Sequence, residues 1–373
     1  MSEVYAARRA LLRERFATAG AEAAVVSRPA NVRYLCGAAP TAGALLLFGA
    51  AAGAQDALVC PGDPAGEQHR ERADDALRRV LLPATEDGTD PVLAAARLAA
   101  SAGAGVLAVE EHHLSVARHR TLAAVPGLRL ADLGCAVEQQ RLVKDEEELS
   151  CLRIAAEIAD QALGELLESI LVGRTERHLA LELERRLIDH GADGPAFPTV
   201  VGTGVNAGRP GHTPTDRRVE EGDFLSICLG AGYRGYRCEV GRTFVIGTTP
   251  ADWQIELYDL VFEAQRAGRE ALAPGAAYRD VDAAARHVLD SAGYGEGVGA
   301  RTGHGVGLEI DEDPRLSPSA MGKLDACVPV TVEPGVHLPG RGGVRIDDTL
   351  VVRPEADGGP ELLTITTKEL LAL

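Results

Sequence analysis

Residues 302–312 read Thr-Gly-His-Gly-Val-Gly-Leu-Glu-Ile-Asp-Glu, and this stretch determines how the rest of the chain is interpreted. Its glycines favour tight turns that let neighbouring strands approach closely. A histidine between two glycines is unusual for a core residue, so we expect His304 to be functional. The acid that follows, Asp311, is expected to lie near the same pocket.

Three further segments of the C-terminal region also combine glycine or proline with isolated titratable side chains. They span residues 211–217, 222–244 and 332–348. Their candidate site residues are His212, Cys228, Glu239, Glu333, His337, Arg345 and Asp347. These four segments look unlike scaffold and indicate that the chemistry of the chain lies in this region.

A repeated pattern surrounds these segments. Helices are predicted over residues 147–170 and 175–190, and again over 256–273 and 279–292. In each pair, one glycine follows the first helix and a second glycine, 18 residues later, follows the second helix. Strand-rich sequence comes after each pair. The pattern indicates a duplicated α+β unit, with two halves about a pseudo-twofold axis and a ligand pocket between them.

The N-terminal part has a different organisation. Short apolar runs typical of strands alternate with helical segments, which predicts a small α/β domain with a mixed or parallel sheet. The expected strands are 23–26, 44–48, 57–60 and 106–109, and the expected helices are 5–18, 91–102 and 116–124. We expect this domain to span residues 1–142 and the catalytic domain to span 143–373.

Composition narrows the function classes. The net charge of −17 would repel phosphate backbones and anionic lipid, so we expect neither nucleic acid nor membrane as a partner. The seven cysteines are scattered, without a CxxC pair, which indicates neither a disulfide framework nor a zinc knuckle. The N-terminus has no signal-peptide pattern, and no apolar run is long enough for a membrane helix. We therefore expect a cytoplasmic protein.

In order and spacing, the four segments resemble the family of Xaa-Pro dipeptidase, aminopeptidase P, methionine aminopeptidase and creatinase, the "pita-bread" hydrolases. Asn31-Val32-Arg33-Tyr34-Leu35, followed by Gly37, resembles the N-terminal domain of its dipeptidase and creatinase branch. The resemblance implies a C–N bond hydrolase with a creatinase-like α/β domain, a pita-bread catalytic domain and a homodimeric state.

In the metallopeptidases of this family, five side chains (Asp, Asp, His, Glu, Glu) hold two divalent metals. The resemblance places Cys228, Glu239, His304, Glu333 and Asp347 at these positions. Only His304 and Glu333 are the family's own residue types. Losing one carboxylate and changing the length of two others should weaken a dinuclear oxygen-ligand site.

Three states of the site remain open. The expectation we favour is that no cofactor binds, as in creatinase, with His212 as the general base. The alternative is one divalent metal, zinc or manganese, held by Glu239, His304, Glu333 and Asp347. Two metals are the least favoured. Several carboxylates together need a cation, which could instead belong to the substrate.

The favoured function is hydrolysis of an amide, amidine or guanidino bond in a small, cationic substrate bound by Asp311. Glu333 and Glu239 would orient water or the substrate nitrogen, while His304 and His337 polarise or protonate the leaving side.

For two residues of the pocket, the sequence leaves several roles open. Arg345 either binds a substrate carboxylate or pairs with Asp347 or Asp348. Cys228 is a buried packing residue by base rate, although nucleophile and ligand roles stay open.

Two other functions remain as alternatives. The first is a metal-dependent Xaa-Pro dipeptidase or aminopeptidase acting on dipeptide-like substrates. The second is a non-catalytic binding module on the same fold, against which the presence of His212, His304 and Glu333 argues.

Overall fold

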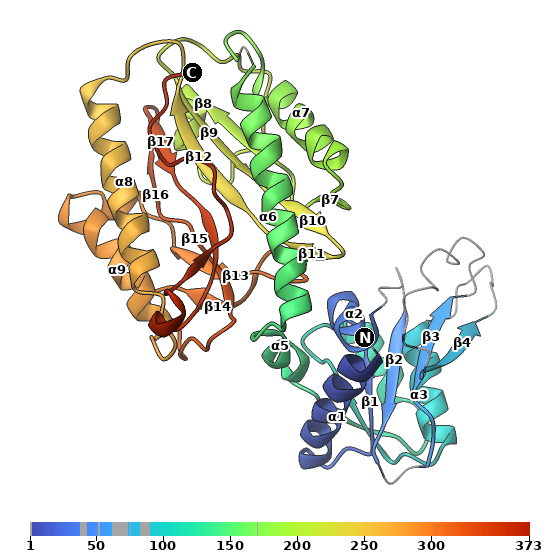
Figure 1. Cartoon of the computed structure of the whole chain (residues 1–373). Helices are drawn as coiled ribbons and strands as arrows, with labels where there is room; N and C mark the ends of the chain where they lie inside the picture. Colours follow the sequence, from blue (N-terminus) through green and yellow to red (C-terminus); the bar gives the residue numbers. More distant parts are fainter. Residues whose placement is uncertain are drawn as a thin grey trace. The chain divides into compact units, whose positions relative to one another are not determined.

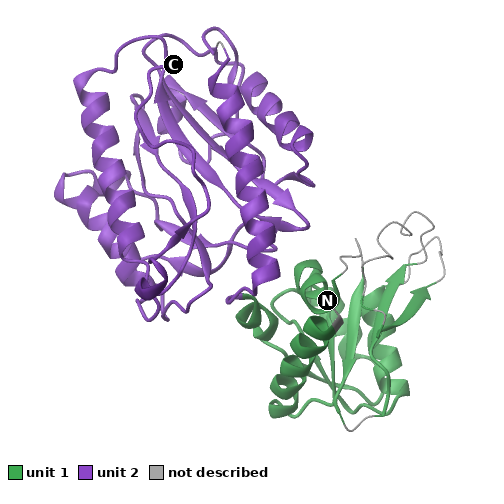
Figure 2. Ribbon diagram, viewed as in Figure 1, with its two compact units in different colours: residues 1–141 green, residues 142–373 purple. Residues whose placement is uncertain are grey.

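The structure is a computed structural model that describes residues 2–37, 43–50, 53–61, 74, 76–82, 90–169 and 171–373. The chain forms two compact units, Met1–Arg141 and Leu142–Leu373, which Figure 2 shows in separate colours. This division lies one residue from the boundary expected after residue 142. None of the helices in the described ranges is long and apolar enough to span a bilayer.

In its described residues, unit 1 is an α/β domain with a six-stranded mixed sheet of the order β4-β3-β2-β1-β5-β6. Strand β1 runs parallel to β5, and β5 runs parallel to β6, whereas β2 is antiparallel to both of its neighbours. The strands are β1 Ala23–Val26, β2 Ala44–Phe48, β3 Ala57–Pro61, β4 Arg78–Leu82, β5 Val106–Val109 and β6 Arg129–Asp132. The helices are α1 Ser2–Thr18, α2 Pro29–Cys36, α3 Pro91–Ser101, α4 Val116–Ala123 and α5 Ala136–Arg141.

Four of these elements, α2, β4, β6 and α5, were not predicted from the sequence. Strand β6 is only four residues long and has exposed ends, so it lacks a clear apolar pattern. Helix α2 begins at Pro29, which suits the first turn of a helix. It ends at Gly37, whose φ of 78° lies in the left-handed region that glycine tolerates best.

Unit 2 repeats one order of elements twice, as the glycine spacing predicted. Helices α6 Glu146–Leu167 and α7 Glu176–Asp189 precede one set of antiparallel strands, and α8 Asp252–Glu270 and α9 Tyr278–Ser291 precede another. Ile170, where the first of these helices was expected to end, lies outside the described residues. Figure 1 shows α6 and α7 on one side of the strands and α8 and α9 on the other. This is the predicted pita-bread arrangement.

The strands of unit 2 form four sheets with the orders β11-β10-β7, β12-β9-β8, β14-β13-β15-β18-β19 and β16-β17. Those of the first half are β7 Gly194–Pro195, β8 Val200–Thr203, β9 Phe224–Leu229, β10 Ala231–Tyr233, β11 Tyr236–Arg237 and β12 Val240–Val245. Those of the second half are β13 Gly303–Gly305, β14 Glu312–Leu316, β15 Pro329–Val332, β16 Gly335–Leu338, β17 Gly342–Arg345, β18 Asp348–Val351 and β19 Glu361–Leu362. Short 3-10 turns lie at η2 Gly204–Gly208, η3 Gly295–Gly297 and η4 Glu355–Asp357.

A backbone bridge is among the contacts that join the two halves of unit 2. Gly241, in β12, pairs with Asp347, which lies between β17 and β18, through hydrogen bonds of 3.1 and 3.0 Å in the two directions. A side chain at position 241 would overlap the Asp347 carboxylate, so this close approach requires glycine. The bridge brings the ends of strands from both halves together, and the candidate site lies there.

Candidate active site

Five of the candidate residues are brought together by strand register. Cys228 lies in β9 opposite Gly241, and Glu239 directly precedes β12. His304 lies in β13 opposite Thr331 of β15, and Glu333 directly follows β15. Asp347 completes the group through its bridge to Gly241. Adjacent antiparallel strands therefore collect side chains that are up to 119 positions apart, 347 minus 228.

His304 faces two carboxylates. Its Nε2 lies 3.5 Å from Glu333 Oε1 and 3.7 Å from Glu239 Oε1. Its Nδ1 lies 3.1 Å from the carbonyl oxygen of Gly305. Because a carbonyl only accepts hydrogen bonds, Nδ1 carries the proton in this contact, and the lone pair of Nε2 is directed at the carboxylates.

Glu239 is held firmly in this position. Its Oε1 accepts a 2.9 Å hydrogen bond from Thr331 Oγ1, and its backbone carbonyl accepts one of 2.8 Å from Thr349 Oγ1. Burial raises the pKa of Glu239 well above its usual value, and the charges of Glu333 and Asp347 raise it further, against the opposing effect of Arg345. The carboxyl group therefore needs a nearby cation to stay ionised at neutral pH.

Arg345 provides a cation on one side of this group. Its Nε donates a 2.7 Å hydrogen bond to Asp347 Oδ1, and its guanidinium also contacts Glu333 Oε2 closely. The same group lies 3.9 Å from Glu239 Oε1. Of the interpretations left open for Arg345, the structure shows pairing with Asp347, whereas Asp348 pairs with Arg242 at 2.8 Å.

Cys228 is buried beside these charges. Burial raises the pKa of its thiol well above the usual value, Arg345 opposes this, and Asp347 and Glu239 add to it. A thiol in this environment stays protonated, and a protonated thiol is a poor nucleophile. These surroundings favour the packing interpretation of Cys228.

Asp311 is not an unpaired acid, contrary to what the hypothesis of a cationic substrate assumed. Arg301 NH1 lies 2.8 Å from Asp311 Oδ2, and Arg301 Nε lies 3.6 Å from Glu333 Oε1. The Asp311 side chain is 41% exposed. Arg301, a residue that the sequence analysis did not single out, therefore lies between Asp311 and the cluster and already neutralises Asp311.

His212 is oriented by a second residue that the sequence analysis missed. Its Nε2 lies 2.8 Å from Glu176 Oε2, and Glu176 is fully buried. The same carboxylate accepts hydrogen bonds from the backbone N–H of Thr203, the Asn206 amide, and both the N–H and hydroxyl of Thr215.

The tautomer of His212 follows from these contacts. Burial alone would raise the pKa of Glu176, but hydrogen bonds from Thr215, Thr203, His212 and Asn206 bring it below the ordinary value. An ionised carboxylate only accepts hydrogen bonds, so Nε2 of His212 carries the proton and Nδ1 keeps a lone pair. The partner of this ring is thus Glu176 rather than a member of the carboxylate cluster.

His337 lies in β16, next to the residues that contact Arg345. Burial lowers its pKa, and the positive charge of Arg345 lowers it further, against a backbone hydrogen bond with Ala207 that raises it. Its Nδ1 is buried without a hydrogen-bond partner. A neutral imidazole fits these surroundings better than a charged one.

The donor set fits one divalent ion. Glu239, His304 and Glu333 each offer an atom within 4.8 Å of the other two. Ligand atoms at about 2.0–2.1 Å from a tetrahedral ion are separated by about 3.3–3.4 Å, close to the 3.5 and 3.7 Å found around His304 Nε2. Three protein ligands leave a coordination position for water or substrate, as in catalytic zinc sites.

The side toward Cys228 and Asp347 fits a second ion poorly. The cation present there is Arg345, which already occupies Asp347 Oδ1 and Glu333 Oε2. Adding a divalent ion beside a guanidinium would place two positive groups against the same carboxylates. The Cys228 thiol would also have to lose its proton in surroundings that hold it. These contacts favour one metal ion beside the arginine over two.

Comparisons with known sequences agree with the two-unit architecture. Residues 150–354 match metallopeptidase family M24, and residues 8–143 match the creatinase/prolidase N-terminal domain. The Xaa-Pro dipeptidase of Pyrococcus horikoshii is 37% identical over 235 residues, which is 63% of this chain and 66%, just under two thirds, of that protein. The uncharacterized peptidase YqhT of Bacillus subtilis is 32% identical over 97% of this chain and 99% of its own length.

Solved structures extend the similarity over the whole chain. An Xaa-Pro dipeptidase from Bacillus anthracis superposes with a TM-score of 0.90 at 31% identity, covering 99% of this chain and 100% of that one. The prolidase from Pyrococcus horikoshii gives a TM-score of 0.87 at 30% identity, with 97% and 99% covered. An X-Pro aminopeptidase from Thermotoga maritima gives 0.83 at 28% identity, with 96% and 100% covered.

Proposed function

The chain belongs to metallopeptidase family M24, a family of C–N bond hydrolases, and from this premise we propose that it is an Xaa-Pro dipeptidase or aminopeptidase that works with one divalent metal ion. The observation that carries the proposal is the triangle of donor atoms on Glu239, His304 and Glu333, with the His304 Nε2 lone pair directed into it. The substrate class is supported by relatives named as Xaa-Pro dipeptidases that are about one third identical to this chain.

Each ligand would keep its geometry through a second contact. Thr331 fixes the Glu239 carboxylate, the Gly305 carbonyl fixes the His304 ring, and Arg345 holds the far oxygen of Glu333. Such outer contacts orient metal ligands and restrict their rotamers. A divalent ion bound here supplies a Lewis acid that polarises the scissile carbonyl and makes water more acidic.

Proton transfer is assigned to His212. Its Nε2–H is directed at Glu176, so the Nδ1 lone pair is the atom available to accept a proton from water or a substrate N–H. Glu176 would stabilise the imidazolium that results, since the negative charge lies 2.8 Å from the ring. The Glu176 carboxylate is thus a positioning group that acts through His212.

The family match favours this metal-dependent function over the metal-free hydrolysis of a cationic substrate that the sequence analysis preferred. That preference depended on a surplus of unpaired carboxylates that included Asp311. Arg301 neutralises Asp311, and Arg345 neutralises Asp347 and part of Glu333. The negative charge left for an external cation is on Glu239 and Glu333, beside Nε2 of His304, which suits one divalent ion.

A comparison of substrates with and without metal tests the proposal. Chelator-treated protein is supplied with manganese or zinc and given Ala-Pro, with Pro-Ala as the reversed control and Ala-Pro-Ala to separate dipeptidase from aminopeptidase action. We expect metal-dependent hydrolysis of a peptide with proline in second position, and no hydrolysis of Pro-Ala. Turnover of a guanidino compound in the presence of chelator, without Ala-Pro hydrolysis, would contradict the proposal and support the metal-free reaction.

Two further expectations accompany this function. The scattered cysteines suggest a reducing, cytoplasmic compartment, and the resemblance to the dipeptidase branch suggests a homodimer. Both stay predictions, which fractionation and light scattering would check.

A further inference from the structure

A second group of metal-binding side chains lies in unit 1, at the carboxyl ends of its parallel strands. β1, β5 and β6 are adjacent and parallel. His112 lies three residues after β5, and Cys135 lies three residues after β6. Glu138 follows one turn later in α5. Loops that leave the carboxyl ends of neighbouring parallel strands meet at one sheet edge, which is where α/β sheets usually bind ligands.

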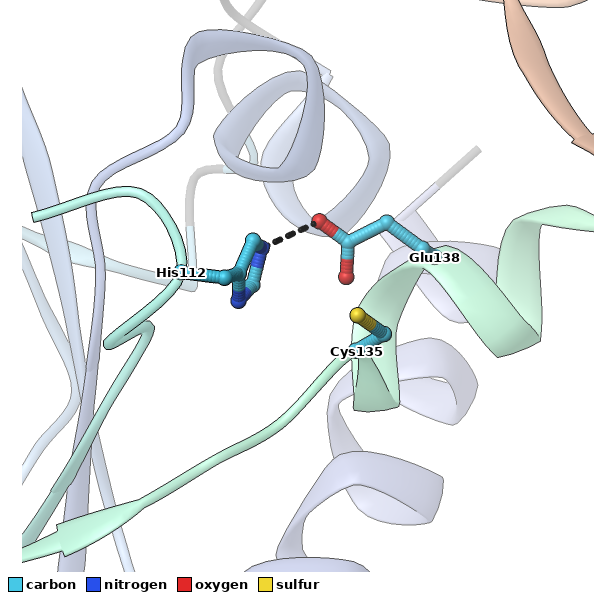
Figure 3. Close-up of side chains that lie close together, drawn as sticks. All are labelled: His112, Cys135 and Glu138. Atoms are coloured by element: carbon cyan, nitrogen blue, oxygen red, sulfur yellow. Dashed lines mark hydrogen bonds and ion pairs between the residues drawn. The ribbon is translucent and has the colours of Figure 1, made fainter.

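The three side chains converge at this edge, as Figure 3 shows. Each offers one ligand atom, and these atoms lie within 4.8 Å of one another. His112 Nε2 lies 3.0 Å from Glu138 Oε1. The His112 side chain is 30% exposed and Cys135 is also exposed, so an ion could reach the group from solvent.

The two oxygens of Glu138 have very different surroundings. Oε1 accepts hydrogen bonds from Asn31 Nδ2 at 2.8 Å and Arg28 NH1 at 3.0 Å, besides its contact with His112. Oε2 is buried and has no hydrogen-bond partner. A buried carboxylate oxygen without a partner is costly, and such an atom calls for an explanation, for example an ion bound to it.

We propose that His112, Cys135 and Glu138 form a binding site for a zinc-like divalent ion, separate from the active site. The ligands would be an imidazole nitrogen, the Cys135 thiolate and Glu138 Oε2, with water in the fourth position. Zinc accepts sulfur, nitrogen and oxygen donors together, whereas a thiolate disfavours magnesium, calcium and manganese. The site satisfies the one Glu138 oxygen that the protein leaves without a partner.

Charge and proton balance are consistent with this assignment. Binding of the ion displaces the Cys135 proton to solvent, and the His112 imidazole binds as the neutral ring, with its one N–H on the nitrogen that the ion does not use. Thiolate plus carboxylate then neutralise the two positive charges of the ion. Arg28 stays on Oε1, the oxygen that the ion does not use. Asn31 and Arg28 orient the carboxylate from behind, as outer partners of metal ligands do.

Cobalt(II) is the probe that tests the proposal, because a thiolate bound to cobalt gives an intense charge-transfer absorption in the near ultraviolet. The full-length protein, freed of metal with a chelator, is titrated with cobalt and then with zinc. We expect the absorption to appear with cobalt and to be displaced by zinc. Cys135→Ser should abolish it, and His112→Ala should weaken zinc binding at least about 10-fold.

Cys228→Ser is the matched control, since Cys228 lies in the other cluster, and it should leave the cobalt absorption unchanged. A second measurement needs no substitution. Zinc should protect the Cys135 thiol from modification by iodoacetamide. It should not protect the exposed His113, the control, from modification by diethyl pyrocarbonate. Cys135→Ser should keep the hydrolytic activity of the parent protein. The proposal is overturned if cobalt gives no thiolate absorption, if Cys135→Ser retains it, or if zinc fails to protect Cys135.

Discussion

Arg345 lies against three carboxylates of the candidate active site. Its guanidinium contacts Asp347 and Glu333 and lies within 3.9 Å of Glu239. Three carboxylates in this small volume would repel one another strongly, and the arginine offsets part of that repulsion. Under the proposed function, the negative charge that remains on the carboxylates is matched by one divalent ion.

Replacing Arg345 with methionine tests this role. The substitution leaves Asp347 without its cation and leaves Glu333 with only Arg301, whose Nε lies 3.6 Å away. Removing one partner of a fully buried ion pair costs about 3–5 kcal/mol. Since the Arg345 side chain is 32% exposed, we expect a smaller loss of about 2–3 kcal/mol in the free energy of unfolding, measured in urea with chelator. Added manganese should restore part of the loss. Arg315→Met, at an exposed position of β14, should have little effect, and an equally small effect of Arg345→Met would refute the role.

The Glu176–His212 contact makes a separate prediction about catalysis. In Glu176→Gln, the amide can donate to His212 and so favour the wrong tautomer. General acid–base groups contribute about 10²–10⁴-fold, so we expect kcat to fall by about that range with a smaller change in KM. Glu184→Gln is the control, because Glu184 lies in the same helix and accepts from the Thr199 N–H. If both variants keep kcat within a few-fold of the parent, His212 does not transfer the proton.

The same carboxylate should contribute to acid stability. Its folded-state pKa lies below the ordinary value of 4.5, because its hydrogen bonds outweigh burial. A lowered folded pKa stabilises the fold fully above about pH 5, and the contribution disappears as pH falls through the folded pKa. The unfolding free energies of the parent and Glu176→Gln should therefore differ most at neutral pH and converge in acid. A difference that does not change with pH would contradict this assignment.

For single residues, the sequence predicted the members of the active-site cluster but not the charged residues that pair with them. Glu239, His304, Glu333 and Asp347 were identified through short motifs, and strand pairing brings them together. Arg301 and Glu176 carry no comparable local signal. An acid in the first turn of a helix is expected to interact with the helix dipole, and nothing in the sequence shows that Glu176 is buried against the 203–215 loop.

At the scale of the elements, β12 is held by a buried ion pair. Arg242 is fully buried and donates to the carbonyls of Gly241, Asp347, Thr366 and Thr367, and it pairs with Asp348 at 2.8 Å. These contacts join β12, the start of β18 and the C-terminal segment. Glu239 and Asp347 lie directly beside these elements, so the arginine also holds two candidate ligands at their separation.

We expect Arg242→Met to destabilise the fold strongly. Removing one partner of a buried pair costs about 3–5 kcal/mol, and several carbonyls also lose their donor. Lys368 Nζ lies 2.7 Å from Asp348 Oδ2 and would still pair with it. The loss in the free energy of unfolding should therefore be smaller than for an acid with no partner. Urea unfolding of Arg242→Met against Arg266→Met, on the exposed face of α8, would measure the difference. Equal stability of the two variants would be inconsistent with this view of β12.

Element prediction succeeded where local signals were strong. The four helices of unit 2 were each expected within a few residues, because glycines follow their ends and an acidic run suits the first turn of α6. The structure adds a capping box of Asp145 and Glu148 at the start of α6. β4 and β6 were missed because their exposed residues interrupt the apolar pattern. These strands depend on neighbours in the sheet, which sequence periodicity cannot show.

At the scale of the whole molecule, the two units hold two donor sets of different chemistry. Unit 2 offers two carboxylates and an imidazole, a set suited to manganese or zinc, whereas unit 1 offers a thiol, an imidazole and a carboxylate. In protein loaded with zinc, the total metal content would therefore be the sum of the zinc bound at both sites. Manganese, which thiolates do not favour, reports on the active site separately.

Manganese titration followed by electron paramagnetic resonance tests most directly the proposal that the active site holds one divalent ion beside Arg345. The concentration of free manganese is measured while chelator-treated protein is added in steps. We expect one tightly bound ion per chain, with an affinity at least about 100-fold weaker in His304→Ala and unchanged in His287→Ala. Two coupled manganese ions per chain, or no tightly bound ion in an actively hydrolysing protein, would contradict the account.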